Sequence, residues 1–209
     1  MACGISPPKA QGATVLAYSY SAATTGNQAH PGNLGLDFDV LSTSIEVTEL
    51  LAFDSDADGW VGTSTLITVG IFDSTGTLVT PTVTFSPSNM GTLTGGSYRT
   101  LSIAPTTLAV GSYTVVAVGF NNDDMNFNTS GGSGGPTTDD NVGLIAFVGG
   151  GSYDFGTTLA DPSSPDGGGV QRYGAGSFAF SEVPEPSASL LAGIVGLTML
   201  TRRNRRADS

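Results

Sequence analysis

Short runs rich in Val, Ile, Thr, Phe and Tyr recur along the middle of this 209-residue sequence, and Gly, Pro, Asn or Asp residues bound each run. Branched and aromatic residues favour extended backbone, and the bounding residues are those that turns use. Helical periodicity is absent. The spacing predicts an all-β domain, an antiparallel β-sandwich of about nine strands. The expected strands are 14–21, 35–41, 44–53, 66–73, 77–85, 98–103, 111–120, 142–148 and 170–180.

Two of these runs indicate where they lie. In 66–73 the residues Ile67, Val69 and Ile71 alternate with a polar residue or glycine, which is typical of a strand with one face on the core. The run 111–120 is apolar at both alternating sets of positions, so we expect a central strand covered on both faces. Residues 73–76 read Asp-Ser-Thr-Gly, which predicts a hairpin turn.

Two segments are dominated by turn-forming residues. They are 126–141 and 149–169, and both are rich in Gly, Ser, Asp and Asn. Such segments bury too little apolar surface to offset the entropy lost on ordering. We expect both to be long loops, and long loops in compact domains are often functional.

The C-terminal residues 183–209 differ in composition from the rest. An uncharged apolar run, 187–201, lies between two prolines and a cluster of arginines. This order predicts one short transmembrane helix, with the arginines on the cytoplasmic side and the preceding domain outside. At a rise of 1.5 Å per residue the run covers about 22 Å, less than the roughly 30 Å of a bilayer core. The flanking residues are Val183, Pro184, Glu185 and Pro186 before the run and Arg202, Arg203, Arg205 and Arg206 after it.

This C-terminal order resembles the PEP-CTERM sorting signal of Gram-negative bacteria, which a membrane transpeptidase called exosortase handles. Pro184, Glu185 and Pro186 match the motif. The resemblance implies an exported cell-surface or biofilm-matrix protein. Its partners would be the inner membrane and exosortase during sorting, with exopolysaccharide as a further candidate. The precursor would be anchored in the inner membrane, with its globular domain first periplasmic and then at the cell surface or outside the cell. An ordinary tail anchor or a buried apolar helix is the alternative interpretation of the apolar run.

The sequence divides into three parts. Residues 1–8 contain neither the basic nor the apolar region of a signal peptide, but 10–12 read Ala-Gln-Gly, the small-x-small form of a cleavage site. We interpret 1–12 as the remnant of a truncated signal peptide, 13–182 as the exported β-sandwich domain and 183–209 as the sorting signal. A lipoprotein cleavage site at Ala2-Cys3 is the alternative for the first part.

The charge of the middle of the chain excludes one class of partner. Residues 13–186 hold seventeen acidic residues against two basic ones, Arg99 and Arg172, for a formal charge of −15. Affinity for nucleic acid comes mainly from Lys and Arg neutralising phosphates, so nucleic acid is not an expected partner. An acidic surface suits a protein that stays soluble outside a cell.

Part of the domain also resembles a domain of unknown function found in extracellular bacterial proteins. The resemblance covers 44–120, implies a jelly-roll-like sandwich and brings no enzyme activity. It is carried by Ile45-x-Val47-Thr48-x-Leu50, then Phe53-Asp54-x-Asp56-x-Asp58-Gly59-Trp60, then Val69-Gly70-Ile71-Phe72-Asp73-x-x-Gly76-Thr77-Leu78.

The run Asp54-Ser55-Asp56-Ala57-Asp58-Gly59 has the DxDxDG spacing of a calcium loop. Asp54, Asp56 and Asp58 are therefore candidate ligands for Ca²⁺. Thr65 stands where an EF-hand has its glutamate, so an EF-hand is excluded, and the remaining oxygens would come from other loops. The alternative is an ordinary turn between strands, since Asp and Gly are what such turns use. Candidates for the remaining oxygens are Asp123, Asp124, Asp139 and Asp140.

Trp60, the only tryptophan, follows this run. An exposed indole there would be a candidate glycan contact, and a buried one would be a core residue. The sole histidine, His30, has no Ser or Cys motif near it, so the sequence indicates no catalytic residue and no enzyme. The expected function is a non-catalytic surface or matrix protein. The alternatives are a calcium-assisted carbohydrate-binding module and a secreted hydrolase acting through a pair of carboxylates.

Overall fold

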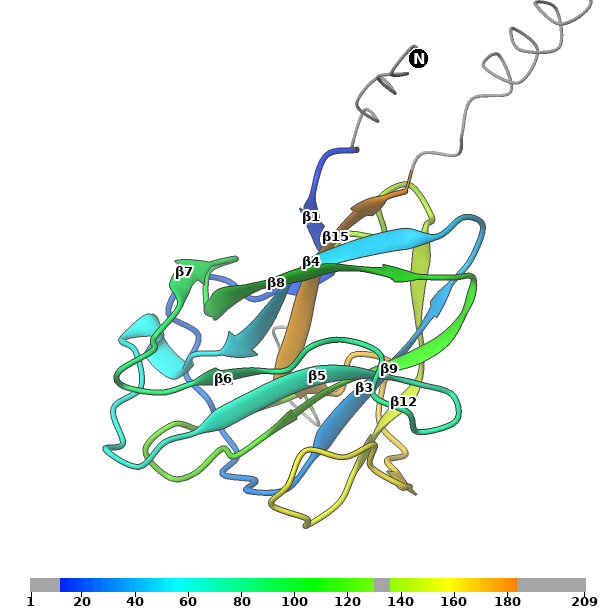
Figure 1. The fold of residues 1–209 in the computed structure, drawn as a ribbon. Helices are drawn as coiled ribbons and strands as arrows, with labels where there is room; N and C mark the ends of the chain where they lie inside the picture. Colours follow the sequence, from blue (N-terminus) through cyan, green and yellow to red (C-terminus); the bar gives the residue numbers. More distant parts are fainter. Residues whose placement is uncertain (1–11, 130–135, 184–209) are drawn as a thin grey trace, which may run out of the picture.

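Two antiparallel sheets face each other across a shared core in the computed structural model, which describes residues 12–129 and 136–183 (Figure 1). One sheet has the strand order β1-β15-β4-β8-β7 and the other β13-β12-β3-β9-β5-β6. Strands β10 and β14 pair in a small addition, as do β2 and β11. The predicted all-β, sandwich-like architecture is therefore confirmed.

The strand bounds follow the chain in order. They are β1 Val15–Leu16, β2 Tyr18–Ser19, β3 Leu34–Val40, β4 Ile45–Phe53, β5 Ile67–Asp73, β6 Val83–Phe85, β7 Thr92–Thr94, β8 Tyr98–Leu108, β9 Gly111–Val118, β10 Phe127–Asn128, β11 Thr137–Thr138, β12 Ile145–Tyr153, β13 Ser164–Pro165, β14 Tyr173–Gly174 and β15 Gly176–Glu182. A single 3-10 turn, η1, covers Ser55–Ala57.

Aromatic residues join the two sheets at the centre of the core. Phe178 of β15 lies in one sheet and Phe38 of β3 in the other, and their ring centroids are 4.6 Å apart. Both side chains are fully buried. Contact of this kind removes a large apolar area from water on each side, which is what holds the sheets face to face.

Strand β9 is central and covered on both faces, as its sequence predicts. It lies between β3 and β5, and its residues from Val115 to Val118 are buried. Val115 and Ala117 join the core between the sheets. Val116 lies on the other face, opposite Gly35 and Gly70 of the neighbouring strands.

That outer face is covered by a segment the sequence predicts to be a free loop. A Cβ at Gly35 would lie 2.9 Å from Pro162, and one at Gly70 would lie 3.0 Å from Leu159. The two glycines therefore let residues around 159–162 pack directly on the sheet. Val116 is fully buried for this reason.

The predicted turn at 73–76 is confirmed. The Asp73 carboxylate accepts the N–H groups of Thr75 at 2.9 Å and Thr77 at 3.0 Å. Gly76 has a φ of +76° and donates its N–H to the Asp73 carbonyl. Glycine adopts this φ without steric cost, which is why it closes the turn.

Several predicted boundaries are wrong. The run 77–85 is a strand only over β6, because the backbone leaves the sheet before Pro81, a residue that cannot donate to a ladder. The run 14–21 is split at Ala17 and 170–180 is split at Ala175. The strand expected over 142–148 is observed as β12, which begins at Ile145 and continues through three glycines to Tyr153. Its pairing with β3 shifts register between Val148 and Ser152. The segments 126–141 and 149–169 contain the short strands β10, β11 and β13 as well as the end of β12, so they are not loops throughout.

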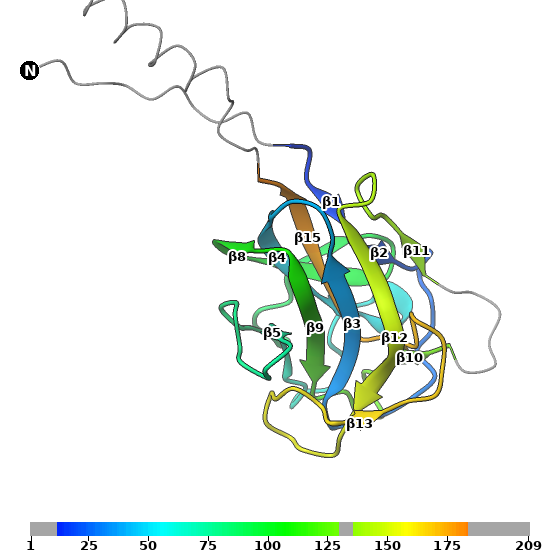
Figure 2. The same ribbon diagram turned by 90° about the vertical axis from the view of Figure 1, so that its right-hand side faces the viewer.

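The described chain enters and leaves the sandwich at the same end. Val15 of β1 pairs with Phe180 of β15, and the N–H of Val183 donates to the Ser44 carbonyl at 3.0 Å. Figure 2 shows β1 and β15 together at one end and β13 at the opposite end. Over residues 12–129 and 136–183, no helix is long and apolar enough to cross a membrane. The predicted transmembrane helix, 187–201, lies outside the described residues.

Candidate binding cleft

Asp54, the first candidate calcium ligand, is engaged by an arginine. Its side chain is fully buried, and its Oδ2 lies 2.6 Å from Nε of Arg99 on β8. The Gly59 N–H donates to both carboxylate oxygens, at 3.2 and 3.1 Å. Burial raises the pKa of Asp54, and the Arg99 guanidinium acts against that shift. The carboxylate therefore already has a cation and a backbone donor as partners.

Asp56 and Asp58 do not join Asp54 around a common point. Both are exposed, and Asp56 accepts hydrogen bonds from the hydroxyls of Thr25 and Ser55. No group of three or more His, Cys, Asp or Glu side chains in the described part of the chain is arranged to hold a metal ion. In this arrangement the DxDxDG run does not present three carboxylates to one ion, because Asp54 is paired with Arg99 and Asp56 is bonded to hydroxyl groups. Calcium binding by this run stays a prediction.

The other candidate oxygens serve local structure. Asp124 is buried and accepts the N–H groups of Val61 at 3.0 Å and Gly62 at 3.1 Å, together with the Thr65 hydroxyl. Asp139 accepts the Asn141 N–H at 2.8 Å. Asp123 and Asp140 are exposed. Asp124 and Asp139 therefore fix turns in different parts of the molecule.

Trp60 is a core residue. It is 3 % exposed, its ring packs on Phe85 with centroids 5.6 Å apart, and its Nε1–H donates to the Met90 carbonyl at 3.2 Å. A glycan contact at Trp60 would need an exposed ring face. The structure therefore corrects the prediction that Trp60 is a candidate stacking platform, because the ring fills the gap between β6 and the start of β7.

Of the sorting-motif residues, only Val183 is within the described chain. Pro184, Glu185, Pro186, Arg202, Arg203, Arg205 and Arg206 lie outside the described residues.

A cleft of about 450 Å³ opens where the chain segments around β10, β12, β13 and β14 meet. The start of β3 also reaches it through Leu34. Most of the residues lining it are polar or aromatic: Gln28, His30, Leu34, Asn128, Tyr153, Phe155, Pro165, Asp166, Gly167, Arg172 and Tyr173. None of them was a predicted site residue, although His30 was considered and set aside.

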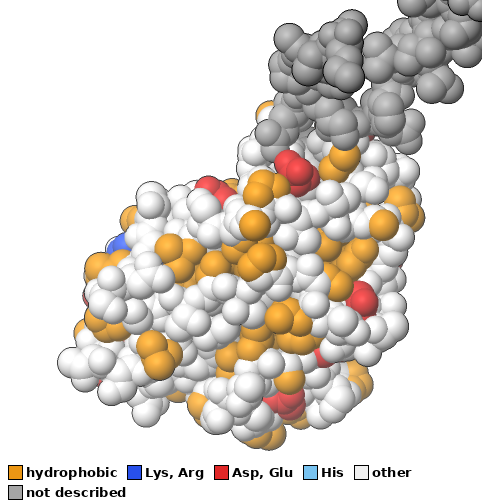
Figure 3. All heavy atoms as spheres, in the orientation of Figure 1, with side chains coloured by type: hydrophobic (Ala, Val, Ile, Leu, Met, Phe, Trp, Pro, Cys, Tyr) orange, Lys and Arg blue, Asp and Glu red, His pale blue; other side chains and the backbone are white. Residues whose placement is uncertain are grey.

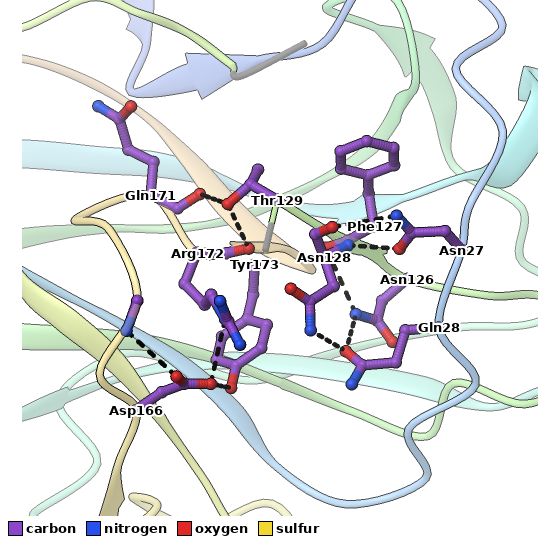
Figure 4. A network of polar contacts seen from close by, with 11 residues as sticks. Asn27, Gln28, Asn126, Phe127, Asn128, Thr129, Asp166, Gln171, Arg172 and Tyr173 are labelled. Carbon is purple, nitrogen blue, oxygen red and sulfur yellow. Dashed lines mark hydrogen bonds and ion pairs between the residues drawn. The ribbon is translucent and has the colours of Figure 1, made fainter. Parts of the chain in front are cut away.

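An amide network fixes Gln28 on one side of the cleft (Figure 4). Its Oε1 accepts hydrogen bonds from Nδ2 of Asn126 at 3.0 Å and from Nδ2 of Asn128 at 3.1 Å. Because both donors are amide N–H groups, the orientation of the Gln28 amide is settled. Backbone hydrogen bonds join the same segments, since Asn126 and Gln28 exchange N–H···O contacts in both directions at 2.9 and 3.0 Å.

A second network lies across from Gln28 and is built on Asp166 (Figure 4). Asp166 Oδ2 accepts from Nε of Arg172 at 3.1 Å and from the Tyr173 hydroxyl, and Oδ1 accepts the Gly168 N–H at 3.2 Å. Burial, followed by the neighbouring Asp166 carboxylate, raises the pKa of Tyr173. The phenol therefore stays protonated and donates to Asp166.

Three rings form the remaining wall of the cleft. Phe155 is 75 % exposed, and its ring centroid lies 5.3 Å from that of His30 and 5.9 Å from that of Tyr153. His30 is buried, and its Nε2 lies 2.7 Å from the Asp154 carbonyl. A carbonyl only accepts, so Nε2 carries the proton and Nδ1 is the acceptor in the neutral ring.

Asn33 anchors the loop that carries Phe155. Its Nδ2 donates to Asp154 Oδ1 at 2.9 Å, to the Gly156 carbonyl at 3.1 Å and to the Thr158 carbonyl at 3.0 Å. Its Oδ1 accepts the Ala160 N–H at 3.0 Å. One fully buried amide therefore fixes residues 154–160 in place.

Charged side chains are few on the surface. Figure 3 shows one face of the molecule, on which isolated Asp and Glu side chains lie among apolar side chains and other, uncharged atoms. Arg99 and Arg172 are the only Lys or Arg residues in the described ranges, and each is paired with a carboxylate. The domain therefore offers no unpaired basic side chain to a phosphate backbone.

The cleft is lined by amide and guanidinium N–H donors and an exposed ring, and its one carboxylate accepts from three donors. Comparison of the chain with family models, with curated proteins and with solved structures finds no match.

Proposed function

We propose that this protein is an exported, non-catalytic surface or matrix protein, directed by a PEP-CTERM signal and processed by exosortase. The observation that carries the proposal is the order at the C-terminal end of the sequence: Pro184-Glu185-Pro186, then an uncharged apolar run, then four arginines within 202–206. Before processing, the chain is an inner-membrane precursor whose domain lies in the periplasm. After processing, the domain is at the cell surface or in the matrix.

Features of the domain support this proposal. Its formal charge is strongly negative over 13–186, which favours solubility outside the cell and disfavours nucleic acid. Most long strands that follow one another, such as β3 and β4 or β8 and β9, lie in opposite sheets. This crossing supports a jelly-roll-like type of sandwich, the type implied by the extracellular domain that residues 44–120 resemble.

The non-catalytic part of the proposal is supported by the contacts of the cleft carboxylate. Asp166 is held by Arg172, Tyr173 and a backbone N–H, and glycoside hydrolysis by paired carboxylates needs one of them free to transfer a proton.

The sorting signal is tested in a Gram-negative host with and without an exosortase. We expect the wild-type chain to lose its C-terminal segment and leave the inner-membrane fraction only when exosortase is present, which mass spectrometry of each fraction measures. The variant Pro184→Ala/Glu185→Ala/Pro186→Ala should stay in the inner membrane at full length. Pro87→Ala, a proline change inside the domain, is the matched control and should be processed normally. Recovery of the full-length native chain as a soluble cytosolic species would overturn the proposal.

A further inference from the structure

We propose that the cleft between Gln28 and Arg172 binds a segment of a neutral glycan chain, with Phe155 as the ring on which a sugar stacks. This proposal names a ligand class for the proposed surface or matrix protein. It rests on the proposed function in one respect, that export brings the domain into contact with extracellular glycans. It differs from the sequence-based carbohydrate hypothesis in every residue, because that hypothesis used Trp60 and calcium.

The Gln28 amide is oriented toward a ligand by its own hydrogen bonds. Its oxygen is used twice within the protein, and its Nε2 makes no hydrogen bond to any described residue. Figure 4 shows this nitrogen on the side of the amide away from Asn126 and Asn128. An amide whose acceptor is tied up and whose two N–H donors are free is pre-organised to donate to ligand oxygens.

The opposite wall of the cleft supplies further N–H donors. Arg172 uses only its Nε to bind Asp166, so the terminal nitrogens of the guanidinium remain as planar donors in the lining of the cleft. The paired Asp166 balances its charge. The guanidinium of Arg172 and the amide of Gln28 can therefore both donate hydrogen bonds to neighbouring hydroxyl groups of one ligand, and these hydroxyl groups carry no charge.

An exposed aromatic ring lies at the edge of the cleft. Phe155 is the most exposed aromatic side chain among the large exposed hydrophobic residues of the described chain, yet it is fixed by His30, Tyr153 and the Asn33-anchored loop. An aromatic face held at the edge of a polar cleft is suited to the apolar C–H face of a pyranose ring. The sugar's hydroxyls then point toward the amide and the guanidinium.

Size and charge favour a neutral chain over other ligands. The volume of about 450 Å³ lies within the roughly 300–1,000 Å³ of small-ligand sites. The formal charge of −15 over 13–186 repels a polyanion such as a polyuronate. An uncharged polyhydroxylated chain meets no such repulsion.

The test is isothermal titration of the full-length chain in a detergent without a sugar headgroup. The probes are cellohexaose and mannohexaose as neutral chains and a galacturonate hexamer as the charged comparator. We expect saturable binding of at least one neutral probe with a Kd between about 10 µM and about 1 mM. The galacturonate probe should bind at least about tenfold more weakly at low salt.

Substitutions at the cleft separate this proposal from chance binding. Phe155→Ala should weaken binding at least about tenfold, and so should Gln28→Glu, which keeps an oxygen acceptor for Asn126 and Asn128 and removes the N–H donors. Phe155→Tyr, which keeps the ring, should retain binding. Val110→Ala is the matched control, because Val110 is 57 % exposed and does not line the cleft. The thermal midpoints of all four variants, measured by circular dichroism, should stay close to the wild-type value.

The fluorescence of Trp60 adds an independent readout. Because this sole tryptophan is buried away from the cleft lining, its emission should not change on titration. The proposal is overturned by the absence of saturable binding to both neutral probes, by tighter binding of galacturonate, or by binding that survives Phe155→Ala. The sorting-motif variant should bind the glycan like the wild type, so a failure of sorting and a failure of binding are distinguishable.

Discussion

At the scale of single residues, the same amino acids that suggest a metal loop build a buried ion pair. Asp54 begins the DxDxDG run, but its partner is Arg99. Removing one member of a buried pair leaves the other charge without compensation, which costs roughly 3–5 kcal/mol. Arg99 should therefore be important for stability.

We predict that Arg99→Met lowers the free energy of unfolding by about 3–5 kcal/mol, because it leaves the Asp54 carboxylate buried and unpaired. Urea denaturation followed by the fluorescence of Trp60 measures this change. The double variant Asp54→Asn/Arg99→Met should recover part of the loss. An Arg99→Met variant as stable as the wild type would contradict the role assigned to the pair.

A pH dependence follows from the turn at 73–76. The Thr75 hydroxyl, then the N–H groups of Thr77 and Thr75, lower the pKa of Asp73 below its ordinary value of 3.8. A carboxylate whose pKa is lower in the folded state stabilises the fold above its unfolded pKa. That contribution is lost as the pH falls through the folded pKa.

We therefore predict that Asp73→Asn reduces the fall of the thermal midpoint between pH 5 and pH 2 relative to the wild type. Thr75→Val, which removes the first donor, should act in the same direction but less strongly. Differential scanning calorimetry at a series of pH values measures both. Identical pH profiles for the wild type and Asp73→Asn would show that the turn carboxylate does not contribute.

At the scale of elements, the strongly patterned strands are predictable and the short ones are not. β3, β4, β5 and β9 have long apolar or alternating runs, and their observed bounds lie within two residues of those expected. The two-residue strands β10 and β11 consist of ordinary loop residues and exist because they pair with β14 and β2. Such pairings depend on chain segments far away, which a local pattern does not encode.

The candidate site is beyond sequence reasoning for the same reason. Gln28 reaches its amide partners about a hundred positions away, and Arg172 lies still further along the chain. No spacing of residues links them. The available signal is the pair Tyr153 and Phe155, two large aromatic residues in the Gly-, Ser- and Asp-rich run 149–169, where loop composition alone does not account for them.

We predict that Asn33→Ala releases the loop that bears Phe155. The change removes the hydrogen bonds that the Asn33 side chain makes to residues 154–160. Buried polar groups of the loop then lack partners, which should lower the free energy of unfolding by about 1–3 kcal/mol. Hydrogen–deuterium exchange should rise over 156–160 and stay unchanged over β9. Unchanged protection of 156–160 would mean that the loop is fixed by packing on Gly35 and Gly70 alone.

At the scale of the whole molecule, one core serves both sheets. Phe178 belongs to the five-stranded sheet and touches Phe38 of the six-stranded sheet, so neither sheet keeps its buried face without the other. A domain with a single shared core is expected to unfold in one cooperative step.

We predict that Phe178→Ala lowers the free energy of unfolding by about 3–5 kcal/mol while near- and far-ultraviolet circular dichroism still report one common midpoint. Val110→Ala, at an exposed position, should change it by less than about 0.5 kcal/mol. Two separated transitions in Phe178→Ala would mean that the sheets are stable independently.

The pairing of β1 with β15 makes the two ends of the sandwich different. Both strands lie at one pole, whereas Leu34, Tyr153 and the cleft they border lie near the other, at the far ends of β3 and β12. β3 has seven residues, and six rises of about 3.4 Å place its first and last Cα atoms roughly 20 Å apart. A structure that holds the described chain at β1 and at the end of β15 would therefore leave the cleft at the opposite end of the domain, facing the surroundings.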